Sequence, residues 1–403
     1  MPTAFKAIQI CEDVYWVGAI DWTLRDFHGY STSRGSTYNA FLIMADKVTL
    51  IDTVKAPFKH EMMSRIASVI DPSKIDYIVS HHTEMDHSGS LPEVVDEVKP
   101  EKLFASRAGA VAMKQHFHRD LEPVAVADGE DIALGQMKLT FFDTKMLHWP
   151  ESIVSYLHER KVLFSQDIFG LHLASSERFD DELPEDILYF EAAKYYANIV
   201  MPYSPLVKKL LKKVEGLGVE FDMIAPDHGP IWRTNPTRII KWYHKWAEMK
   251  PENKAVIIYD TMWKSCRKMA ASIADGLAQE GVSAKVLEIG STNRSEVATE
   301  LLECGAIIVG SPTINNNIFP SVADVLTYAK GLKPRNLVGA VFATYGWSGE
   351  AVNHLEAVLE EMKVEKVAES VNIQYVPDDA ALEKCRELGL CVARSLKEKL
   401  QVE

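Results

Sequence analysis

Short apolar runs that end in polar or glycine-containing segments recur along the whole chain. Six of these runs have the length of buried strands: residues 75–80, 139–142, 161–165, 254–260, 306–310 and 338–342. After residue 254 such runs alternate with helical segments. Before residue 254 the predicted strands cluster at the two ends of that part of the chain. This change of pattern predicts two domains, both of the α/β class.

A polar, proline-containing stretch at residues 250–254 separates the two patterns. It follows an aromatic helical segment at 237–249 and precedes the first apolar run of the second pattern, so it fits a linker. A chain of 403 residues also exceeds what one hydrophobic core usually supports. We therefore expect one domain at residues 1–250 and a second at 254–403.

The composition is that of an ordinary globular protein. Hydrophobic residues make up 47% of the chain and charged residues 25%. No apolar run reaches the ~18–20 residues that a membrane span needs, and the first ten residues do not form a signal peptide. We therefore expect a cytoplasmic protein that does not enter a membrane. The formal net charge of −13 opposes nucleic-acid binding, because phosphate backbones attract Lys and Arg.

The five cysteines do not suggest a metal site or a disulfide framework. Their number is odd and no two of them form Cys-x-x-Cys. The sequence therefore predicts neither a disulfide scaffold nor a cysteine-ligated zinc or iron site. We expect most of these thiols to lie in the core.

Potential metal ligands gather directly after the apolar run at 75–80 and again after three later strands. The candidates are His82, Glu84, Asp86, His87, His148, Asp167 and His228. Imidazole binds iron, zinc, nickel or copper, and carboxylate oxygen shifts the preference toward harder ions. Each residue alone is typical of a solvated surface, but together they exceed what one tetrahedral zinc uses. The pattern therefore predicts two metals, and alternation predicts that His82, Glu84 and Asp86 share one face of an extended segment.

Three polar loops follow strands of the second half, at residues 261–266, 311–317 and 343–349. The first loop leads into a helix predicted at 267–280, and a helix N-terminus with the hydroxyls of Thr261 and Ser265 is a cradle for an anion. Because the Gly-x-Gly-x-x-Gly fingerprint is absent from this turn, a mononucleotide fits better than NAD or FAD. We expect the three loops to converge at one edge of a parallel sheet.

The run of ligands resembles the diiron site of flavodiiron proteins, and the resemblance covers essentially the whole chain. It implies a metallo-β-lactamase-like αββα sandwich followed by a flavodoxin-like, doubly wound parallel sheet. Hydrolases of this fold mostly have His and zinc where this chain has Glu84, an oxygen ligand that suits iron. The implied ligand sets are His82, Glu84 and His148 for one iron, Asp86, His87 and His228 for the other, and Asp167 as the bridge.

The resemblance also implies that the three polar loops hold FMN, with Trp347 beside the isoalloxazine ring. The phosphate turn departs from a plain flavodoxin loop, because Met262, Trp263 and Cys266 replace hydroxyl side chains. The expected FMN contacts are Thr261, Met262, Trp263, Ser265, Cys266, Ser311, Pro312, Thr313, Asn315, Asn316, Thr344, Tyr345, Gly346, Trp347 and Gly349.

Three further residues are candidates for a role beside the metals. The resemblance brings His28 near the irons as an unligated side chain, although a surface histidine in a glycine-containing loop fits the sequence equally well. Tyr195 and Tyr196 have the helical spacing of core residues. Because the family brings this segment close to the metal pocket, one of these tyrosines would donate a hydrogen bond or a proton to bound substrate.

The implied activity is the reduction of O2 to water, or of NO to N2O, at a diiron centre fed with electrons through FMN. The chain ends after a helix predicted at 379–400, so we expect an external electron donor, either rubredoxin or a reduced deazaflavin. The resemblance further implies a head-to-tail homodimer, or a dimer of dimers, in which each flavin faces the partner's irons. Two alternatives stay open: a zinc hydrolase fused to a flavodoxin, and a pure electron-transfer flavoprotein.

Overall fold

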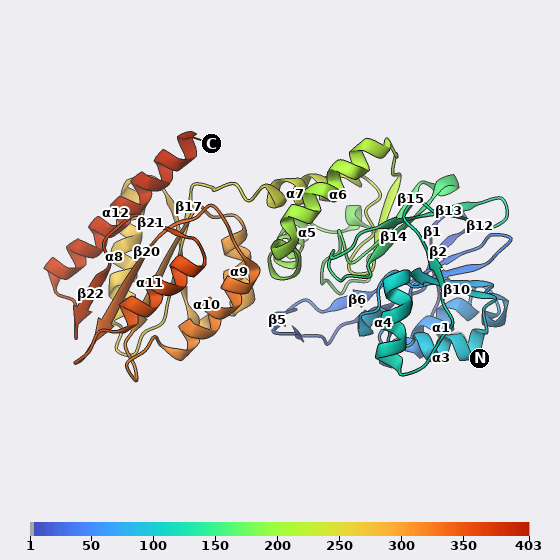
Figure 1. Cartoon of the computed structure of the whole chain (residues 1–403), viewed down its shortest axis with the longest axis horizontal. Coiled ribbons are helices and arrows are strands. Elements are labelled where there is room, and N and C mark those ends of the chain that lie inside the picture. The colour runs from blue at the N-terminus through green and yellow to red at the C-terminus, as the bar shows by residue number, and fades with distance from the viewer. Residues whose placement is uncertain (1–3, 403) are drawn as a thin grey trace. The chain divides into compact units, whose positions relative to one another are not determined.

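The computed structural model describes residues 4–402, which form two compact units (Figure 1). The first unit comprises the chain up to residue 28, residues 32–195 and residues 205–244. The second comprises residues 29–31, residues 196–204 and the chain from residue 245 onward. The sequence did not predict that two short segments of the N-terminal half would cluster with the second unit.

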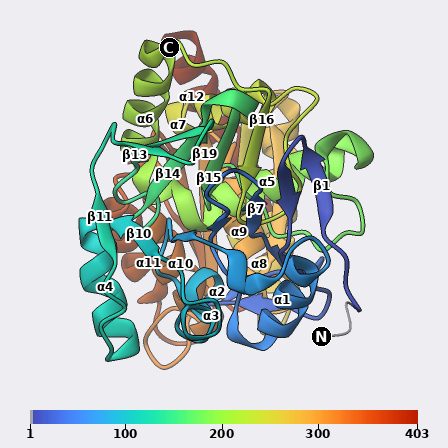
Figure 2. The ribbon, with the colours of Figure 1, turned by 90° about the vertical axis from the view of Figure 1, so that its right-hand side faces the viewer.

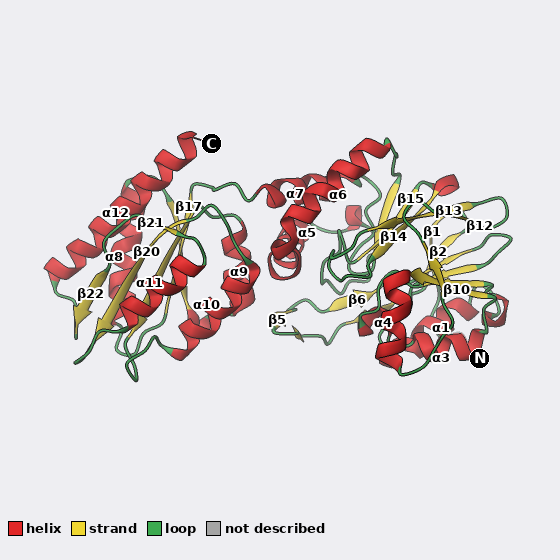
Figure 3. Cartoon of the chain, viewed as in Figure 1, coloured by secondary structure: helices red, strands yellow, loops and turns green. Residues whose placement is uncertain are grey.

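Two β-sheets form the centre of the first unit (Figure 3). The seven-stranded sheet has the order β1 (Ile8–Cys11), β2 (Val14–Trp16), β7 (Phe41–Ile43), β8 (Thr49–Ile51), β9 (Tyr77–Val79), β10 (Lys102–Ser106) and β11 (Val124–Val126). The five-stranded sheet has the order β12 (Asp131–Ala133), β13 (Lys138–Asp143), β14 (Ile153–Leu157), β15 (Val162–Gln166) and β16 (Met223–Pro226). Short strands β3 (Ala19–Asp21) and β6 (Ser36–Tyr38) pair beside them.

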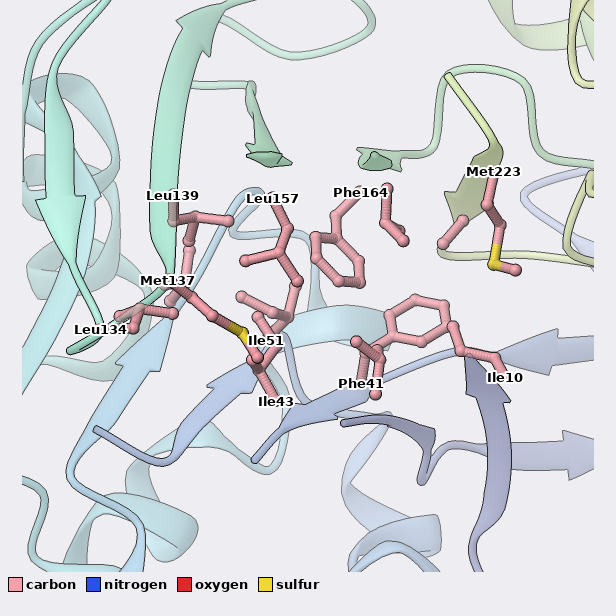
Figure 4. Packing of buried hydrophobic residues seen from close by; sticks show 14 of the residues in the cluster. Ile10, Phe41, Ile43, Ile51, Leu134, Met137, Leu139, Leu157, Phe164 and Met223 are labelled. Atoms are coloured by element: carbon pink, nitrogen blue, oxygen red, sulfur yellow. The ribbon is translucent and has the colours of Figure 1, made fainter. Parts of the chain in front are cut away.

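The inner faces of the two sheets pack against each other and form the core (Figure 4). Phe41 of the first sheet meets Phe164 of the second, with ring centroids 5.3 Å apart. Around this pair lie Ile43, Ile51 and Leu157, which are all fully buried. Each such side chain contributes about 1.5–3 kcal/mol on burial. The predicted ligands follow the ends of strands that this core packs together.

Helices cover the outer faces of both sheets and complete the αββα sandwich. Helices α1 (Lys59–Ala67), α3 (Leu91–Val98) and α4 (Arg107–Phe117) pack on the seven-stranded sheet (Figure 2). Helices α5 (Glu185–Tyr195), α6 (Ser204–Leu217) and α7 (Thr237–Glu248) lie on the side of the five-stranded sheet (Figure 3). Among residues 4–402, no helix is both long enough and apolar enough to cross a membrane.

The second unit is a parallel sheet with helices on both faces. Its strands are β18 (Ser283–Glu288), β17 (Lys254–Tyr259), β19 (Ala306–Pro312) and β20 (Val338–Tyr345), and both β21 (Glu365–Lys366) and β22 (Val371–Gln374) pair with β20. One face carries α8 (Ser265–Gln279) and α12 (Asp379–Val402). The other carries α9 (Arg294–Leu302), α10 (Pro320–Leu332) and α11 (Ala351–Glu361) (Figure 1). This strand order is the doubly wound flavodoxin-like one.

Candidate metal centre and flavin pocket

The first ligands follow β9, and the second half of their run is helical. The short helix α2 spans Met85–Ser88, and the backbone N–H groups of His87 and Ser88 donate to the carbonyl of Glu84 over 3.0 and 2.9 Å. The expected extended segment is therefore wrong beyond Glu84. The helical turn, rather than strand alternation, brings Asp86 and His87 to a second group of ligands.

The other ligands stand near the ends of strands in the five-stranded sheet, as predicted. His148 lies in the loop after β13, Asp167 directly follows β15, and His228 closely follows β16. The strands β15 and β16 are parallel neighbours, so Asp167 and His228 leave the sheet at the same edge. The sandwich therefore brings residues from distant parts of the chain into one buried site.

Four side chains make up the first ligand cluster. The Nε2 atoms of His82 and His148 lie 3.2 and 3.1 Å from Oε2 of Glu84. The same two atoms lie 3.3 and 3.0 Å from Oδ2 of Asp167. These ligand atoms all lie within 4.8 Å of one another, so they could hold one ion.

The second cluster consists of Asp86, His87 and His228. Nε2 of His228 lies 3.2 Å from Oδ2 of Asp86 and 3.2 Å from Nε2 of His87. The other carboxylate oxygen of Asp167, Oδ1, lies 3.1 Å from Nε2 of His87 and 3.4 Å from Nε2 of His228. Asp167 thus presents one oxygen to each cluster.

The polar groups of this site fit two bound cations. Nδ1 of His228 donates to the carbonyl of Thr37 over 2.6 Å, which turns its Nε2 toward the Nε2 of His87, 3.2 Å away. Both carboxylate oxygens of Asp86 are buried and make no hydrogen bond to the part of the chain that the structure describes. Buried polar atoms are rarely left in this way, and cations bound among these ligands would satisfy them.

Electrostatics point to the same conclusion. Burial alone would raise the pKa of Asp167, but His87, His148 and His82 hold the pKa of this carboxyl well below its usual range. Burial alone would lower the pKa of His82, but neighbouring carboxylates, above all that of Asp167, raise it well above its ordinary value. The site therefore strongly favours positive charge at its centre, which is what metal cations supply.

Residues outside the predicted set hold the ligands in place. Oε1 of Glu151 accepts a hydrogen bond from Nδ1 of His82 over 3.1 Å, which turns Nε2 toward the other ligands. His81 is buried between Asp52, 2.6 Å from its Nδ1, and Ser155, 2.8 Å from its Nε2. Asp52 could have been found from the sequence, because it too follows an apolar strand; Glu151 carries no such signal.

The structure separates the three candidates for a role beside the metals. His28 is exposed, and its Nε2 lies 3.5 Å from Oε1 of Glu84. Tyr195 is buried, with its ring centroid 6.2 Å from that of His228. The hydroxyl of Tyr196 is instead 2.8 Å from Oγ of Ser204.

Sequence reasoning missed His172, which lies beside the second cluster. Its ring centroid is 4.6 Å from that of His228 and 5.2 Å from that of Tyr195. Burial and the neighbouring His228 hold its pKa well below the ordinary value, so the imidazole is neutral. His172 stands between two leucines in a segment without a ligand pattern, so no local signal in the sequence marks it.

The polar loops of the second unit line one pocket of about 570 Å³. Its lining residues are Thr261, Met262, Trp263, Ser265, Pro312, Thr313, Ile314, Asn315, Asn316, Thr344, Tyr345, Gly346, Trp347, Ser348, Tyr375 and Val376. Loops after the parallel strands β17, β19 and β20 thus meet at one edge of the sheet, as expected. A further loop after β22, with Tyr375 and Val376, was missed, although it also follows a strand.

Three of the expected FMN contacts lie behind the pocket wall. Cys266 is fully buried, with its sulfur 3.3 Å from the hydroxyl oxygen of Thr344. Oγ of Ser311 accepts from the backbone N–H of Phe319 over 2.8 Å. A side chain at Gly349 would meet the amide group of Asn372, so Gly349 packs against β22. These three residues shape the loops rather than line the pocket.

The pocket fits a phosphate-bearing group with a flat aromatic ring. The hydroxyl oxygens of Thr261 and Thr313 are buried and have no hydrogen-bond partner within the described residues. Helix α8 begins at Ser265 beside them, so its N-terminus faces the same space. Trp263 and Trp347 are each 88% exposed at the rim, an unusual cost in solvation unless a ligand or partner covers such rings.

A sandwich with a dinuclear ligand set, joined to a doubly wound domain with a mononucleotide pocket, defines a class of metal-dependent flavoproteins. Family models agree: residues 37–229 match the ODP family beta lactamase and residues 257–389 match flavodoxin. The chain is 46% identical to the rubredoxin-oxygen oxidoreductase of Megalodesulfovibrio gigas, over 98% of this chain and 99% of that protein. It is 43% identical to the nitric oxide reductase of Moorella thermoacetica, over 96% and 98% of the two chains.

A solved structure extends the likeness to three dimensions. The crystal structure of the flavodiiron protein from Giardia intestinalis matches with a TM-score of 0.96 and 30% identity, and the match covers 100% of this chain and 99% of that one. The chain therefore belongs to the flavodiiron protein family. The predicted fold class and the resemblance stated from the sequence are both confirmed.

Proposed function

We propose that this protein reduces O2 to water, NO to N2O, or both, at a diiron centre that receives electrons through FMN. The observation that carries the proposal is the pair of ligand clusters that share Asp167. Glu84 and Asp86 give each cluster an oxygen ligand of its own, which favours iron over zinc. Relatives named as an oxygen oxidoreductase and a nitric oxide reductase support both substrates.

Iron at both positions would supply the electrons that reduce a diatomic molecule, a chemistry that zinc does not have. One position would be held by His82, Glu84 and His148, the other by Asp86, His87 and His228, and Asp167 would bridge them. The carboxylates neutralise the positive charge of the centre, and the buried imidazoles fix its place in the core.

Residues around the ligands shape the space for a small, uncharged substrate. The ring of Phe27 lies 5.0 Å from that of His172 and 6.4 Å from that of His228, so an aromatic wall faces the second cluster. Burial and the nearby carboxylates raise the pKa of Tyr195 well above its ordinary value, so its hydroxyl keeps its proton and can donate a hydrogen bond. We assign His28, 3.5 Å from Glu84, a role at the exposed side of the site.

The flavodoxin-like unit supplies FMN binding. The hydroxyls of Thr261 and Thr313, together with the start of α8, would receive the phosphate. The rim residues Trp263 and Trp347 would contact the flavin ring. An external donor is needed to reduce this flavin, and the name of the M. gigas relative favours a rubredoxin over a reduced deazaflavin.

Three further features stay predictions. The domain limits 1–250 and 254–403, the cytoplasmic location and the head-to-tail homodimer or dimer of dimers are proposed from the sequence and from the family resemblance. In a head-to-tail dimer, the twofold axis would place each flavin against the irons of the partner.

The function is tested on protein expressed with excess iron and purified without oxygen. Iron, zinc and FMN are measured first, and we expect roughly two irons and one FMN per chain. Chemically reduced rubredoxin is then supplied with O2 or NO, and the consumption of the gas and the release of N2O are followed. Zinc at both positions, with no consumption of either gas, would rule the proposal out.

A further inference from the structure

The carboxylate of Glu151 is hydrogen-bonded to Nδ1 of one candidate metal ligand, His82. This side chain is buried, and its Oε1 accepts from Nδ1 of His82 over 3.1 Å. Oε1 also accepts from the hydroxyl of Thr83 over 2.6 Å and from the backbone N–H of Thr83 over 3.2 Å. Since all three partners donate to it, Glu151 is held as an acceptor, which is the arrangement of an ionised carboxylate.

Two other histidine ligands, His87 and His228, have no carboxylate within hydrogen-bond distance of Nδ1. His228 donates from Nδ1 to the carbonyl of Thr37, which is a neutral acceptor. Nδ1 of His87 lies 3.6 Å from Oδ2 of Asp227, too far for a hydrogen bond, and it makes none with any described residue. Among His82, His87 and His228, only His82 therefore has a carboxylate within hydrogen-bond distance of Nδ1.

Glu151 is also fixed by its surroundings, so the contact does not depend on a mobile side chain. Its backbone carbonyl accepts from the hydroxyl of Ser106, which also accepts from the backbone N–H of Gly109 at the start of α4. The ring of Trp149 packs on the ring of His82 with centroids 5.2 Å apart. These contacts limit rotation of the imidazole and keep water out, and a charge acts more strongly where water is excluded.

We propose that Glu151 is a positioning residue that makes His82 the most electron-donating of these three imidazoles. A carboxylate hydrogen-bonded to the outer nitrogen makes a histidine a more basic ligand. A more basic ligand favours the more highly charged metal, so the position of His82, Glu84 and His148 holds ferric iron more readily than the other position. The inference rests on the proposed function, because it needs iron at both positions.

With iron at both positions, the two reduction potentials would therefore differ. The lower of the two reduction potentials belongs to the His82 position, and the negative charge of Glu151 contributes to the gap. The last electron to enter such a centre would therefore go to the position held by His82, Glu84 and His148.

Glu151→Gln tests the proposal, because it removes the charge while keeping the size and an acceptor oxygen. The iron-loaded protein is titrated with reductant without oxygen, and the redox state of the iron is followed by electron paramagnetic resonance. We expect the lower iron potential to rise by at least the equivalent of a tenfold change in the oxidised-to-reduced ratio, about 59 mV for one electron. The upper potential should move less. Equal movement of both potentials, or none, would overturn the proposal.

Two further variants separate charge from structure. Ser106→Ala frees the loop of Glu151 but keeps its charge, so we expect unchanged potentials; a rise like that of Glu151→Gln would show that Glu151 acts only through loop structure. Thr83→Val removes one donor from Glu151 and leaves its charge less neutralised, so the lower potential should fall. If Glu151→Gln loses its iron, Thr83→Val tests the proposal instead. A fall in the lower potential of Thr83→Val supports the proposal, and a rise or no change in that potential refutes it.

The iron content of the parent protein distinguishes failure of the proposed function from failure of the inference about Glu151. A parent protein that does not bind two irons would contradict the proposed function itself. A parent protein that binds them, with potentials that do not respond to Glu151→Gln, would contradict only the inference about Glu151.

Discussion

The change of Asp167 to Asn is the sharpest test of a shared ligand. Oδ2 of Asp167 lies 3.0 Å from Nε2 of His148, and Oδ1 lies 3.1 Å from Nε2 of His87. Asn has the same shape but lacks the charge, and its amide nitrogen cannot take the place of a carboxylate oxygen. We therefore expect Asp167→Asn to weaken metal binding at both positions together.

The magnitude follows from the place of Asp167 among the ligands. Loss of a partner that only supports a ligand costs about 10–100-fold in metal affinity, so a shared ligand should cost at least about 100-fold per position. With free iron at about 100 times the parent's dissociation constant, binding stabilises the parent by about 2.7 kcal/mol per position and the variant by about 0.4 kcal/mol. The two positions together then lose about 4.6 kcal/mol, or about 9–18 °C in unfolding midpoint for a domain of this size.

The assay is calorimetric unfolding of each protein with and without ferrous iron in the absence of oxygen. The difference between the two midpoints is compared, so that any effect of the mutation on the metal-free protein cancels. Asp180→Asn is the matched control: Asp180 is a buried carboxylate of the same unit that accepts from the backbone N–H of Arg233 over 2.9 Å. The Asp180→Asn change should lower the unfolding midpoints measured with and without iron, and the difference between them should stay the same.

This reasoning is refuted if ferrous iron raises the unfolding midpoint of Asp167→Asn by as much as it raises that of the parent. Loss of only one iron, with the other bound as tightly as before, would also contradict the shared role of Asp167. Metal analysis after dialysis against a chelator distinguishes these two outcomes.

Three other changes test separate parts of the account. Glu84→His should shift metal content toward zinc and abolish gas reduction, since it recreates the run of zinc hydrolases; unchanged iron and turnover would count against the assignment. Trp347→Ala should weaken FMN retention and leave iron content intact, because the two cofactors belong to different units; equal loss of both would contradict this. A heterodimer of an iron-dead chain (His87→Ala with Asp167→Ala) and a flavin-dead chain (altered at Thr261 and Trp347) should recover gas reduction if electrons cross between chains; an inactive heterodimer would argue against the head-to-tail dimer.

The sequence predicted the position of the site because strand ends carry the ligands. The rule that polar residues follow apolar strands located His148, Asp167 and His228 as well as three loops of the flavin pocket. The same rule would have found Tyr375 after β22, but that strand is short and only partly buried, so its pattern is weak.

Other features depend on contacts that no local pattern reveals. The turn of α2 forms because carbonyl and N–H groups around Glu84 pair within the run, and this overrides the alternation that suggested an extended segment. Glu151 and His172 owe their roles to partners far along the chain, at His82 and Ser36. Spacing along the sequence cannot show such pairs, because tertiary packing alone brings them together.

A single-turnover experiment tests the central claim most directly. The same preparation is loaded with iron or with zinc, its FMN is reduced without oxygen, and it is mixed with a limiting amount of O2 while the flavin absorbance and the peroxide yield are followed. We predict fast flavin reoxidation with water as the product in the iron protein, and slow reoxidation with peroxide in the zinc protein, since zinc has no redox chemistry. Equally fast reoxidation without peroxide in the zinc-loaded protein would contradict reduction of the gas at a diiron centre.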